Sequence, residues 1–304
     1  MANLPGGERT KRLLGLTAPG LFVLLWSTGF IGAKLGVPYA EPMTFLTLRF
    51  VAAGTLLTLL ALATGAPWPS SWKALGHIAV VGLLLQAVYL GGVFVAVSRG
   101  MPAGPSALIV SLQPLTVALL AGLTLGERVS RRQWLGFVLG VIGVFLVVVE
   151  KIDPASLPDQ EGFGFVEVGL CALSLLAITA STIYQKRFGM AADLRSGTAL
   201  QYWVAAVAAL FVAWTTEDMR VVWTGEFIFA LGWLVLVLSI GAVSLLMFMI
   251  RMGEVSKVSS YFYLVPPCTA VIAFLIFGET LGLLALAGML VAAVGVALVV
   301  RKAS

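Results

Sequence analysis

The two halves of this chain carry the same residues at a fixed offset of 152 positions. Pro114 matches Pro266, and the pair Gly126-Glu127 matches Gly278-Glu279. The same offset, without any gap, also pairs Lys34 with Lys186, Arg99 with Arg251, Gly136 with Gly288, Gly143 with Gly295, and 146–148 with 298–300. Such self-similarity indicates a duplicated structural unit. We therefore expect two repeats, residues 1–151 and 152–304.

Composition places both repeats in a membrane. Of the 304 residues, 60% are hydrophobic and only 11% are charged, whereas a soluble domain typically carries about 25% charged residues. The apolar residues fall in blocks of about 20, the length that a helix needs to cross a hydrocarbon core of ~30 Å. We expect an all-α polytopic membrane protein with no separate soluble domain.

Ten apolar spans can be assigned, five in each repeat. They cover about 14–33, 43–63, 74–97, 104–125, 133–150, 163–184, 197–214, 227–250, 257–277 and 281–300. Because five is an odd number, the second repeat enters the membrane in the opposite direction. The result is a pair of inverted five-helix repeats, an architecture found in many secondary transporters.

The charges predict the orientation of these spans. If the N-terminus is cytoplasmic, most of the 19 Lys and Arg residues fall in cytoplasmic segments, and the opposite loops hold mainly acids such as Asp153, Asp159 and Glu217. This bias follows the positive-inside rule and puts both termini in the cytoplasm. The net charge of +5 is explained by this topology, and we expect no nucleic-acid partner. Cys171 and Cys268 lie inside spans, which predicts neither a disulfide nor a metal site, and no cofactor is expected.

Short motifs in a fixed order resemble one transporter family. The motifs are Trp26-Ser27-Thr28-Gly29-Phe30, Leu48-Arg49-Phe50, Gln113-Pro114, Gly126-Glu127-Arg128, Gln133 and Gly136, with Pro266, Gly278-Glu279 and Gly288 repeating the last part. Together they resemble the EamA-type branch of the drug/metabolite transporter superfamily, most closely its bacterial aromatic amino acid exporters of the YddG kind. The resemblance implies an inner-membrane exporter of small metabolites, with helices around a central cavity. In the second half, Gln201 stands at the position of Arg49, so we expect a chemically asymmetric cavity.

Prolines occur inside spans at matching positions of the two repeats, namely Pro114 and the pair Pro266-Pro267. A proline within a helix removes one hydrogen bond and kinks or breaks the helix. Interrupted helices at matching positions are the best sequence indication of a transporter's binding site. The alternative is a static kink that only shapes the bundle, and the two roles are compatible.

Polar and aromatic residues near these prolines and on neighbouring spans are the candidates for lining a substrate cavity. They are Trp26, Gln86, Tyr89, Ser111, Gln113, Ser181, Gln185, Ser244, Ser260 and Tyr263. Converging polar groups among aromatic rings suit an amphipathic ligand. The alternative is hydrogen bonding between helices, which contributes on average about 0.6 kcal/mol per contact.

Two ionisable residues, Arg49 and His77, are candidates for binding a substrate carboxylate or a proton. Arg49 lies several residues inside its span, where it either binds a carboxylate or pairs with backbone carbonyls. No Asp lies deep in any expected span, although ion-coupled carriers commonly keep a carboxylate in the membrane. The sequence therefore favours uncoupled facilitation. In the alternative, proton coupling, His77 is the best proton carrier because its reference pKa is near 6.5.

Several other residues have structural interpretations. Lys34, Lys186, Arg99 and Arg251 lie at span ends, where a cation favours a helix C-terminus or reaches the interface. Glu127 and Glu279 are expected near helix N-termini. Ser130 and Gln133 predict a capping box. Gly136 and Gly140 predict a close helix-packing face.

The sequence as a whole predicts an exporter of small metabolites, with aromatic or bulky hydrophobic amino acids as the favoured substrates, working by alternating access. The alternatives are a proton-coupled exporter of drugs or other metabolites and, more distantly, a receptor or scaffold that transports nothing. An enzyme is disfavoured because the spans hold a single His and no His-Glu-x-x-His motif. The expected partners are a small-molecule substrate and membrane lipid. The oligomeric state is left open and is compatible with a monomer.

Overall fold

The computed structural model describes residues 6–125, 130–151, 163–188, 193–242, 245, 262–280 and 282–300. Every regular element in these ranges is a helix, which confirms the expected fold class. Eight helices are long and apolar enough to cross a membrane, and two shorter apolar helices, Val265–Phe277 and Leu283–Gly295, accompany them.

The first repeat contains five rods, two of which are composite. They are α1 (Gly6–Gly36), α2 (Pro42–Ala63), α3 (Trp72–Gly82) continuing through the π-helix η1 (Leu83–Val88) into α4 (Tyr89–Ser98), α5 (Ala103–Val110) followed by α6 (Gln113–Leu125), and α7 (Arg131–Lys151). The expected capping box at the start of α7 is confirmed. The Ser130 amide donates to Gln133 Oε1 at 2.7 Å, and the Gln133 amide donates to Ser130 Oγ at 3.3 Å.

The second repeat follows the same order. It contains α8 (Phe165–Phe188), α9 (Leu194–Thr216), α10 (Gly225–Gly232) continuing into the π-helix η2 (Trp233–Ala242), the 3₁₀ turn η3 (Phe262–Leu264) leading into α13 (Val265–Phe277), and α14 (Leu283–Val300). Apart from residue 245, the end of the expected span 227–250 and the start of the span 257–277 lie outside the described residues.

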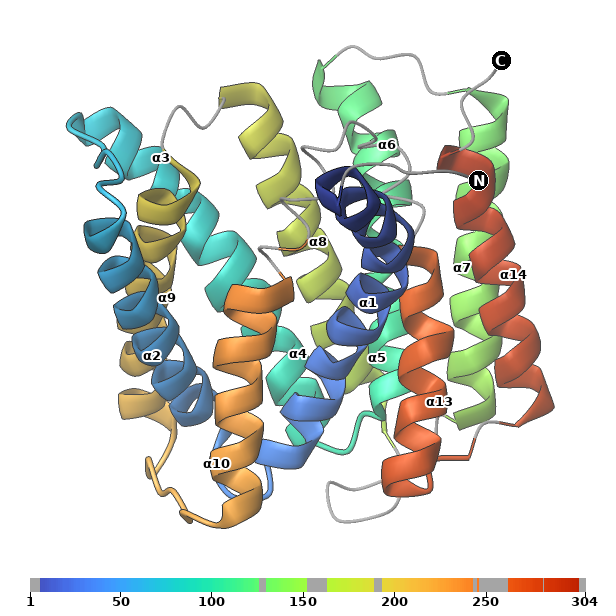
Figure 1. Ribbon diagram of the computed structural model, residues 1–304. Coiled ribbons are helices and arrows are strands. Elements are labelled where there is room, and N and C mark those ends of the chain that lie inside the picture. The colour runs from blue at the N-terminus through green and yellow to red at the C-terminus, as the bar shows by residue number, and fades with distance from the viewer. Residues whose placement is uncertain are drawn as a thin grey trace.

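The two repeats run through the bundle in opposite directions. In Figure 1 the start of α1 and the end of α14 lie at the same end of the molecule, here called the terminal end, and α1 ends at the opposite or far end. The counterpart of α1 is α8, which begins at the far end and runs back to the terminal end. This antiparallel relation is the inversion that five helices per repeat require.

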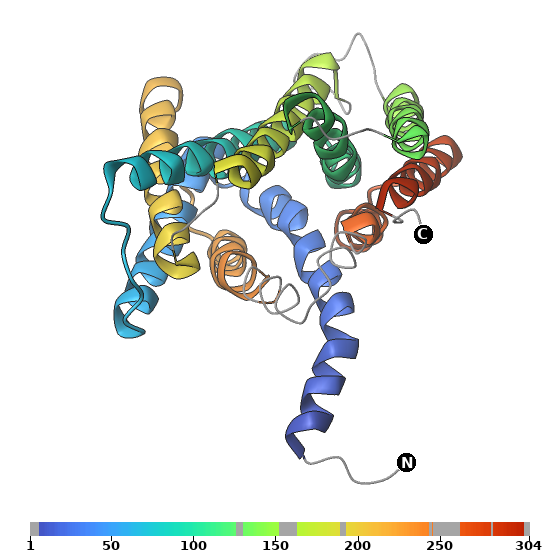
Figure 2. The same cartoon turned by 90° about the horizontal axis from the view of Figure 1, so that it is seen from above.

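The repeats are packed into each other. Each fifth helix contacts the other fifth helix (α7 with α14), each second helix contacts the other second helix (α2 with α9), and each first helix contacts the other repeat's fourth helix (α1 with α13, α8 with α6). Seen from above, the α7–α14 and α2–α9 pairs lie on opposite sides, with the other helices between them (Figure 2).

Glycines allow α7 and α14 to touch backbone to backbone. A Cβ atom placed on Gly143 would lie 2.5 Å from the carbonyl oxygen of Gly288, and one placed on Gly295 would lie 2.6 Å from that of Gly136 and 2.8 Å from the amide of Gly140. The packing role predicted for Gly136 and Gly140 is therefore confirmed. Close contact of this kind replaces the hydrophobic driving force that lipid does not provide.

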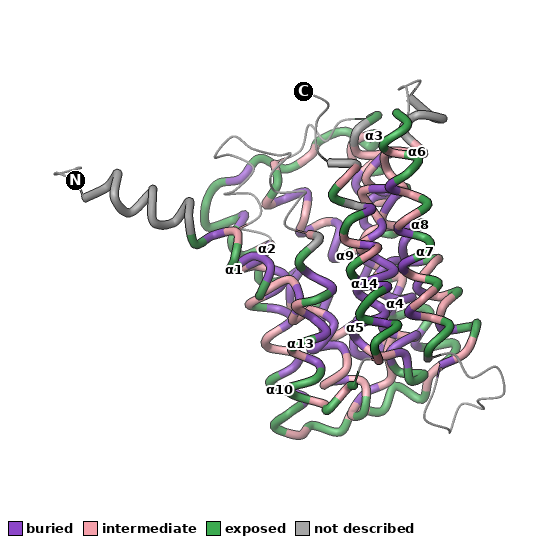
Figure 3. Tube along the Cα trace, turned by 90° about the vertical axis from the view of Figure 1, so that its right-hand side faces the viewer, coloured by how far each residue is buried: buried purple, intermediate pink, exposed green. Residues whose placement is uncertain are grey.

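Buried residues concentrate where helices face each other, and exposed residues lie on the outer faces (Figure 3). Many of the exposed side chains are large and apolar, for example Phe145 (62% exposed), Val207 (68%) and Leu275 (73%). An apolar outer surface is what a chain surrounded by lipid tails requires.

At the far end, polar contacts join the two repeats. Lys34 forms an ion pair with Glu279, and Arg99 Nε lies 2.6 Å from Glu167 Oε1. Glu279 also accepts a hydrogen bond from the Ala103 amide at 3.3 Å, at the start of α5. Lys34 and Arg99 lie at helix ends as expected, and each also binds an acid of the other repeat, which the sequence interpretation did not predict.

Two further contacts join the repeats at the same end. Glu217, after α9, accepts hydrogen bonds from the amides of Met43 and Thr44 at the start of α2, both at 2.8 Å. Ala40 and Val221 form an isolated antiparallel β-bridge. Each of these contacts also joins one repeat to the other, so the two repeats are held together at the far end.

The α7–α14 contact gives a first prediction. Gly143→Ala should lower the free energy of unfolding by about 1–3 kcal/mol, the usual cost of overpacking, because the added methyl group meets backbone that cannot rotate away. Gly169→Ala on α8 is the matched control, since a Cβ atom there meets nothing within 4 Å. The measurement is thermal unfolding in detergent. Equal effects of the two substitutions would contradict the contact.

The far-end ion pair gives a second prediction. A double-mutant cycle with Lys34→Met and Glu279→Gln should show a coupling of about 2 kcal/mol in the free energy of unfolding, because both side chains are partly buried, 32% and 12% exposed. The control cycle uses Arg220 and Asp218, which are 84% and 72% exposed and should couple by less than about 1 kcal/mol. Additive effects at Lys34 and Glu279 would argue against the pair.

Candidate functional site

Both repeats start a new helix at equivalent positions, one residue before the matched prolines. The helix α6 begins at Gln113 and α13 begins at Val265, so Pro114 and Pro266 each occupy the second position, with Pro267 at the third. Pro114 has no amide hydrogen to donate to the preceding turn. The matched helix starts are the geometry that the prolines predict, and their role in gating stays a prediction.

The break before α6 uses Ser111 to repair lost hydrogen bonding. The Leu112 amide donates to Ile109 at 3.2 Å, in a tighter turn than the α-helix. The carbonyl of Leu108 is bonded instead by the Ser111 hydroxyl at 2.7 Å. Ser111 therefore stabilises the break itself in this conformation, although the sequence interpretation placed it among cavity-lining residues.

Both third helices contain a π-helical segment at matching positions, which the sequence interpretation missed. The segment η1 covers Leu83–Val88 and η2 covers Trp233–Ala242; the repeat offset carries the first inside the second. In η2 the Ser239 hydroxyl donates to the Leu234 carbonyl, five residues earlier, at 3.0 Å. Such segments inside α-helices are frequent at functional sites. The candidate Gln86 is buried within η1.

An aromatic cluster joins α1 to the start of the interrupted ninth span. The ring centroids of Phe22, Trp26 and Phe262 lie between 5.1 and 5.3 Å from one another. The next residue along α1, Ser27, donates its hydroxyl to the Val23 carbonyl at 2.7 Å, and the Val265 carbonyl lies 3.3 Å from the same hydroxyl oxygen. The structure therefore places Trp26 beside one of the two proline sites. Phe262 was not singled out from the sequence, and no local signal identified it.

A row of polar contacts joins α6 and α8, which are the counterparts of α13 and α1 in the other repeat. Gln113 Nε2 donates to Thr182 Oγ1 at 3.0 Å, and the hydroxyls of Thr116 and Thr179 lie 2.7 Å apart. Gln113 thus makes the interhelical hydrogen bond that was the alternative to a cavity role.

Of the remaining cavity candidates, the structure describes the side chains of Ser181 and Gln185 on α8 but not those of Ser244, Ser260 and Tyr263. Gln185 Nε2 donates to Ser181 Oγ at 3.2 Å within α8, so these two candidates bind each other. Ser244 and Ser260 lie outside the described residues, as does the side chain of Tyr263, whose backbone belongs to η3.

Arg49 is buried in the middle of the bundle. It lies on α2 and is 6% exposed. Its Nη2 is 3.5 Å from Ser239 Oγ in η2, and its Nε has no hydrogen-bond partner in the part of the chain that the structure describes. Tyr202, on α9, and Tyr89, on α4, lie near enough to interact electrostatically with Arg49, and both helices pack against α2. The backbone carbonyls expected as an alternative partner do not appear among its described hydrogen bonds.

A buried cation without an acid is energetically costly. Leaving one member of a buried ion pair uncompensated typically costs about 3–5 kcal/mol.

Tyr202 was missed by the sequence interpretation, although a signal existed. It directly follows Gln201, the position that matches Arg49 in the repeat.

His77 lies in a small aromatic group between α3 and α8. Its Nδ1 is 2.7 Å from the hydroxyl of Tyr184, and its ring stacks on Phe188 with centroids 5.0 Å apart. His77 is half-buried, and its hydrogen bond to Tyr184 joins the third helix of one repeat to the first helix of the other. Tyr184 and Phe188 were not predicted as its partners.

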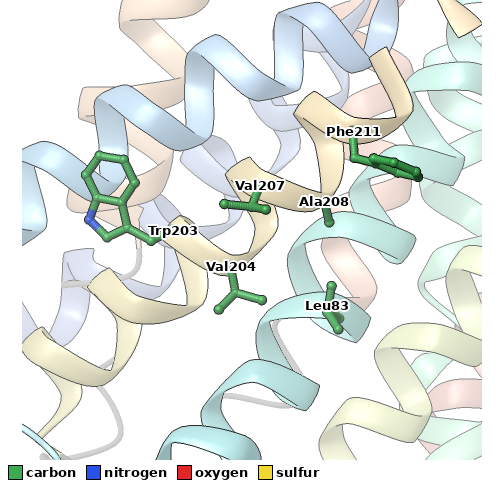
Figure 4. Close-up of a pocket in the computed structure, with 6 residues that line it drawn as sticks. All are labelled: Leu83, Trp203, Val204, Val207, Ala208 and Phe211. Atoms are coloured by element: carbon green, nitrogen blue, oxygen red, sulfur yellow. The ribbon is translucent and has the colours of Figure 1, made fainter. Parts of the chain in front are cut away.

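A groove on the outside of the bundle does not coincide with any of these residues. It lies between α9 and η1, has a volume of about 570 Å³ and is lined by Leu83, Trp203, Val204, Val207, Ala208 and Phe211 (Figure 4). The indole nitrogen of Trp203 is already bonded to Thr58 at 3.1 Å. A groove with this apolar lining offers no group to orient a polar substrate.

Comparison with known proteins agrees with the duplicated fold. The EamA-like transporter family matches the chain twice, over residues 14–149 and 166–301, and the two matches are separated by the offset of the sequence repeat. A crystal structure with 20% sequence identity aligns over 94% of both chains with a TM-score of 0.64, a likeness that supports the fold alone.

Three curated relatives carry transporter names. The uncharacterized transporter YvbV of Bacillus subtilis is 28% identical over 99% of this chain and 94% of its own length. The uncharacterized inner membrane transporter YedA of Escherichia coli K12 is 26% identical over 90% and 86%. A probable amino-acid metabolite efflux pump of the same organism is 25% identical over 44% and 42%. With its helical duplication and two family matches, the chain belongs to the EamA-like transporter family and is a multi-pass membrane transporter.

Proposed function

We propose that this chain exports small zwitterionic metabolites across a bacterial inner membrane, with aromatic and bulky hydrophobic amino acids as preferred substrates. The observation that carries this proposal is the cluster of Phe22, Trp26 and Phe262 beside the interrupted helix. A half-buried indole among other rings offers edge and face contacts to an aromatic side chain, which add about 0.5–1.5 kcal/mol beyond area burial. Interrupted helices are where transporters of inverted repeats bind their substrates.

The names of two relatives fit a substrate related to amino acids and an inner-membrane location. One is named as a probable amino-acid metabolite efflux pump, and another is named as an inner membrane transporter. With both termini in the cytoplasm, as the charge bias predicts, the far end faces the outside.

The proposed mechanism is alternating access driven by the substrate's own gradient. In this conformation ion pairs and hydrogen bonds of residues such as Lys34, Glu279 and Glu217 hold the two repeats together at the far end, and export would require them to separate. In the part of the chain that the structure describes, every Asp and Glu lies in a loop or within one turn of a helix end. A membrane-embedded carboxylate, the usual proton or sodium carrier, is therefore missing from those residues, which favours an uncoupled carrier.

Flux into and out of proteoliposomes tests the proposal. Vesicles loaded with tryptophan or phenylalanine should release them in a saturable manner, with the same initial rate when an ionophore collapses the pH difference. Trp26→Ala should reduce the rate at low substrate concentration about tenfold, the equivalent of 1.4 kcal/mol. Trp72→Ala, which removes an indole that is 88% exposed, is the control. Absence of flux for every amino acid tested would overturn the proposed function.

A proton-coupled exporter of drugs or other metabolites is the second candidate, and the pair of His77 and Tyr184 favours it. A titratable ring hydrogen-bonded across two helices could link a proton to helix movement. For the uncoupled carrier, we expect that flux through the wild-type chain and through His77→Gln is indifferent to an imposed pH gradient. A flux that the gradient accelerates in the wild type, and that His77→Gln makes indifferent to it, would establish the second candidate instead. Tyr184→Phe, which removes only the hydroxyl, separates the hydrogen bond from the stacking.

A further inference from the structure

The most unusual group in the membrane-spanning part of the described chain is the guanidinium of Arg49. It is 6% exposed, and with the described residues it forms one long hydrogen bond of 3.5 Å to Ser239 and leaves its Nε without a partner. The ion pairs that the described residues form, Lys34–Glu279, Arg99–Glu167, Arg195–Asp193 and Arg220–Asp218, do not include it. Among the residues that the structure describes, a permanently charged, bidentate donor is therefore enclosed near hydroxyl groups and has no anionic partner.

The groups around Arg49 come from both repeats. Arg49 and Tyr89 belong to the first repeat, and Ser239 and Tyr202 belong to the second. The π-helical segment η2 of the second repeat brings Ser239 to α2. In the equivalent contact of the first repeat's third helix with α9, Gly82, just before η1, lies against the Gln201 backbone. A ligand held here would therefore be held between the two units that must move relative to each other during alternating access.

The aromatic cluster adjoins this position through Tyr89. Tyr89 interacts with Arg49, and it belongs to the same buried cluster as Phe22, against which Trp26 packs. A ligand with an anionic group on one side and an apolar ring on the other would find both complements within one connected set of residues.

We propose that Arg49, assisted by Ser239 and Tyr202, is the anion-binding half of the substrate site and that it takes a carboxylate. This inference rests on the proposed transport function for its biological meaning, and it names the group that every substrate must carry. A guanidinium presents paired N–H donors that match the two oxygens of a carboxylate, and a carboxylate would supply the charge that the described neighbours of Arg49 lack. Because the guanidinium is enclosed here, the ligand reaches it only when the bundle opens.

The alternative is that Arg49 only holds helices together. Ligands that differ in one group separate the two possibilities. Phenylalanine and 3-phenylpropionate carry a carboxylate, and the second lacks the amino group. Phenylalaninamide keeps the ring and the amino group but replaces the carboxylate by a neutral amide.

The experiment measures binding to the purified full-length chain, by thermal stabilisation and by titration calorimetry, before any transport assay. The wild type should bind both carboxylates and bind the amide about 10- to 100-fold more weakly, the range expected for loss of a charge-assisted hydrogen bond. Arg49→Gln should abolish this preference. Arg49→Lys keeps the charge but loses the paired donors, and should retain part of it.

Controls guard against loss of folding. Arg220→Gln removes an exposed guanidinium and should leave the preference unchanged. If Arg49→Gln does not fold, Ser239→Ala and Tyr202→Phe, which leave the charge in place, should each weaken carboxylate binding severalfold without affecting the amide. Equal binding of phenylalanine and its amide by the wild type, or a preference that survives in Arg49→Gln, would refute the proposal. So would a wild-type chain that binds neither carboxylate.

Transport separates this failure from failure of the proposed function. If phenylalanine and its amide are carried equally, the chain is an amino-acid carrier and Arg49 is not its anion site. If Arg49-dependent carboxylate binding is found but no amino acid is carried, the anion site stands and the substrate is another carboxylate.

Discussion

The packing of each repeat against the other is the interaction on which the rest of this structure depends. Lipid tails offer no hydrophobic drive for helices to associate, so close backbone contact and helix-end hydrogen bonds must do so. The glycine contact of α7 with α14 supplies the first, and the contacts of Lys34 and Glu217 with the opposite repeat supply the second. Because these contacts run between repeats, neither unit completes its packing alone.

The irregular segments of the helices lie at equivalent positions in the two repeats. An uninterrupted α-helix keeps all its carbonyls bonded internally, and both fourth helices depart from that rule at equivalent positions, where α6 and α13 begin. Both third helices depart from it in the π-helical segments η1 and η2. In a bilayer such departures persist only where protein groups satisfy the backbone, as Ser111 does for Leu108. The candidate site is therefore assembled from the irregular parts of otherwise regular helices.

The sequence predicts the fold better than the contacts. The apolar blocks, the repeat offset, the capping box of Ser130 and Gln133 and the helix starts near the prolines follow from local composition. The partners of Lys34, Arg49 and His77 lie 245, 190 and 107 residues away. Such pairs depend on how each helix is rotated about its axis. Helices that are apolar on every side give little periodic signal of that rotation, so the ion pairs could not be read from one sequence.

Because of Arg49, the carrier presents different chemistry to its substrate on the two sides of the membrane. In a perfect inverted duplication, the inward-open and outward-open states would be equivalent by symmetry, and a solute would meet the same half-saturation concentration from either side. With a guanidinium in one repeat and the amide of Gln201 at the matching position, the two states present different chemistry to the solute. An uncoupled carrier must still bring both compartments to equal concentration. A difference in affinity between the two faces must then be balanced by an opposite difference in turnover. The transport kinetics therefore differ between the two directions, although the carrier does not concentrate its substrate.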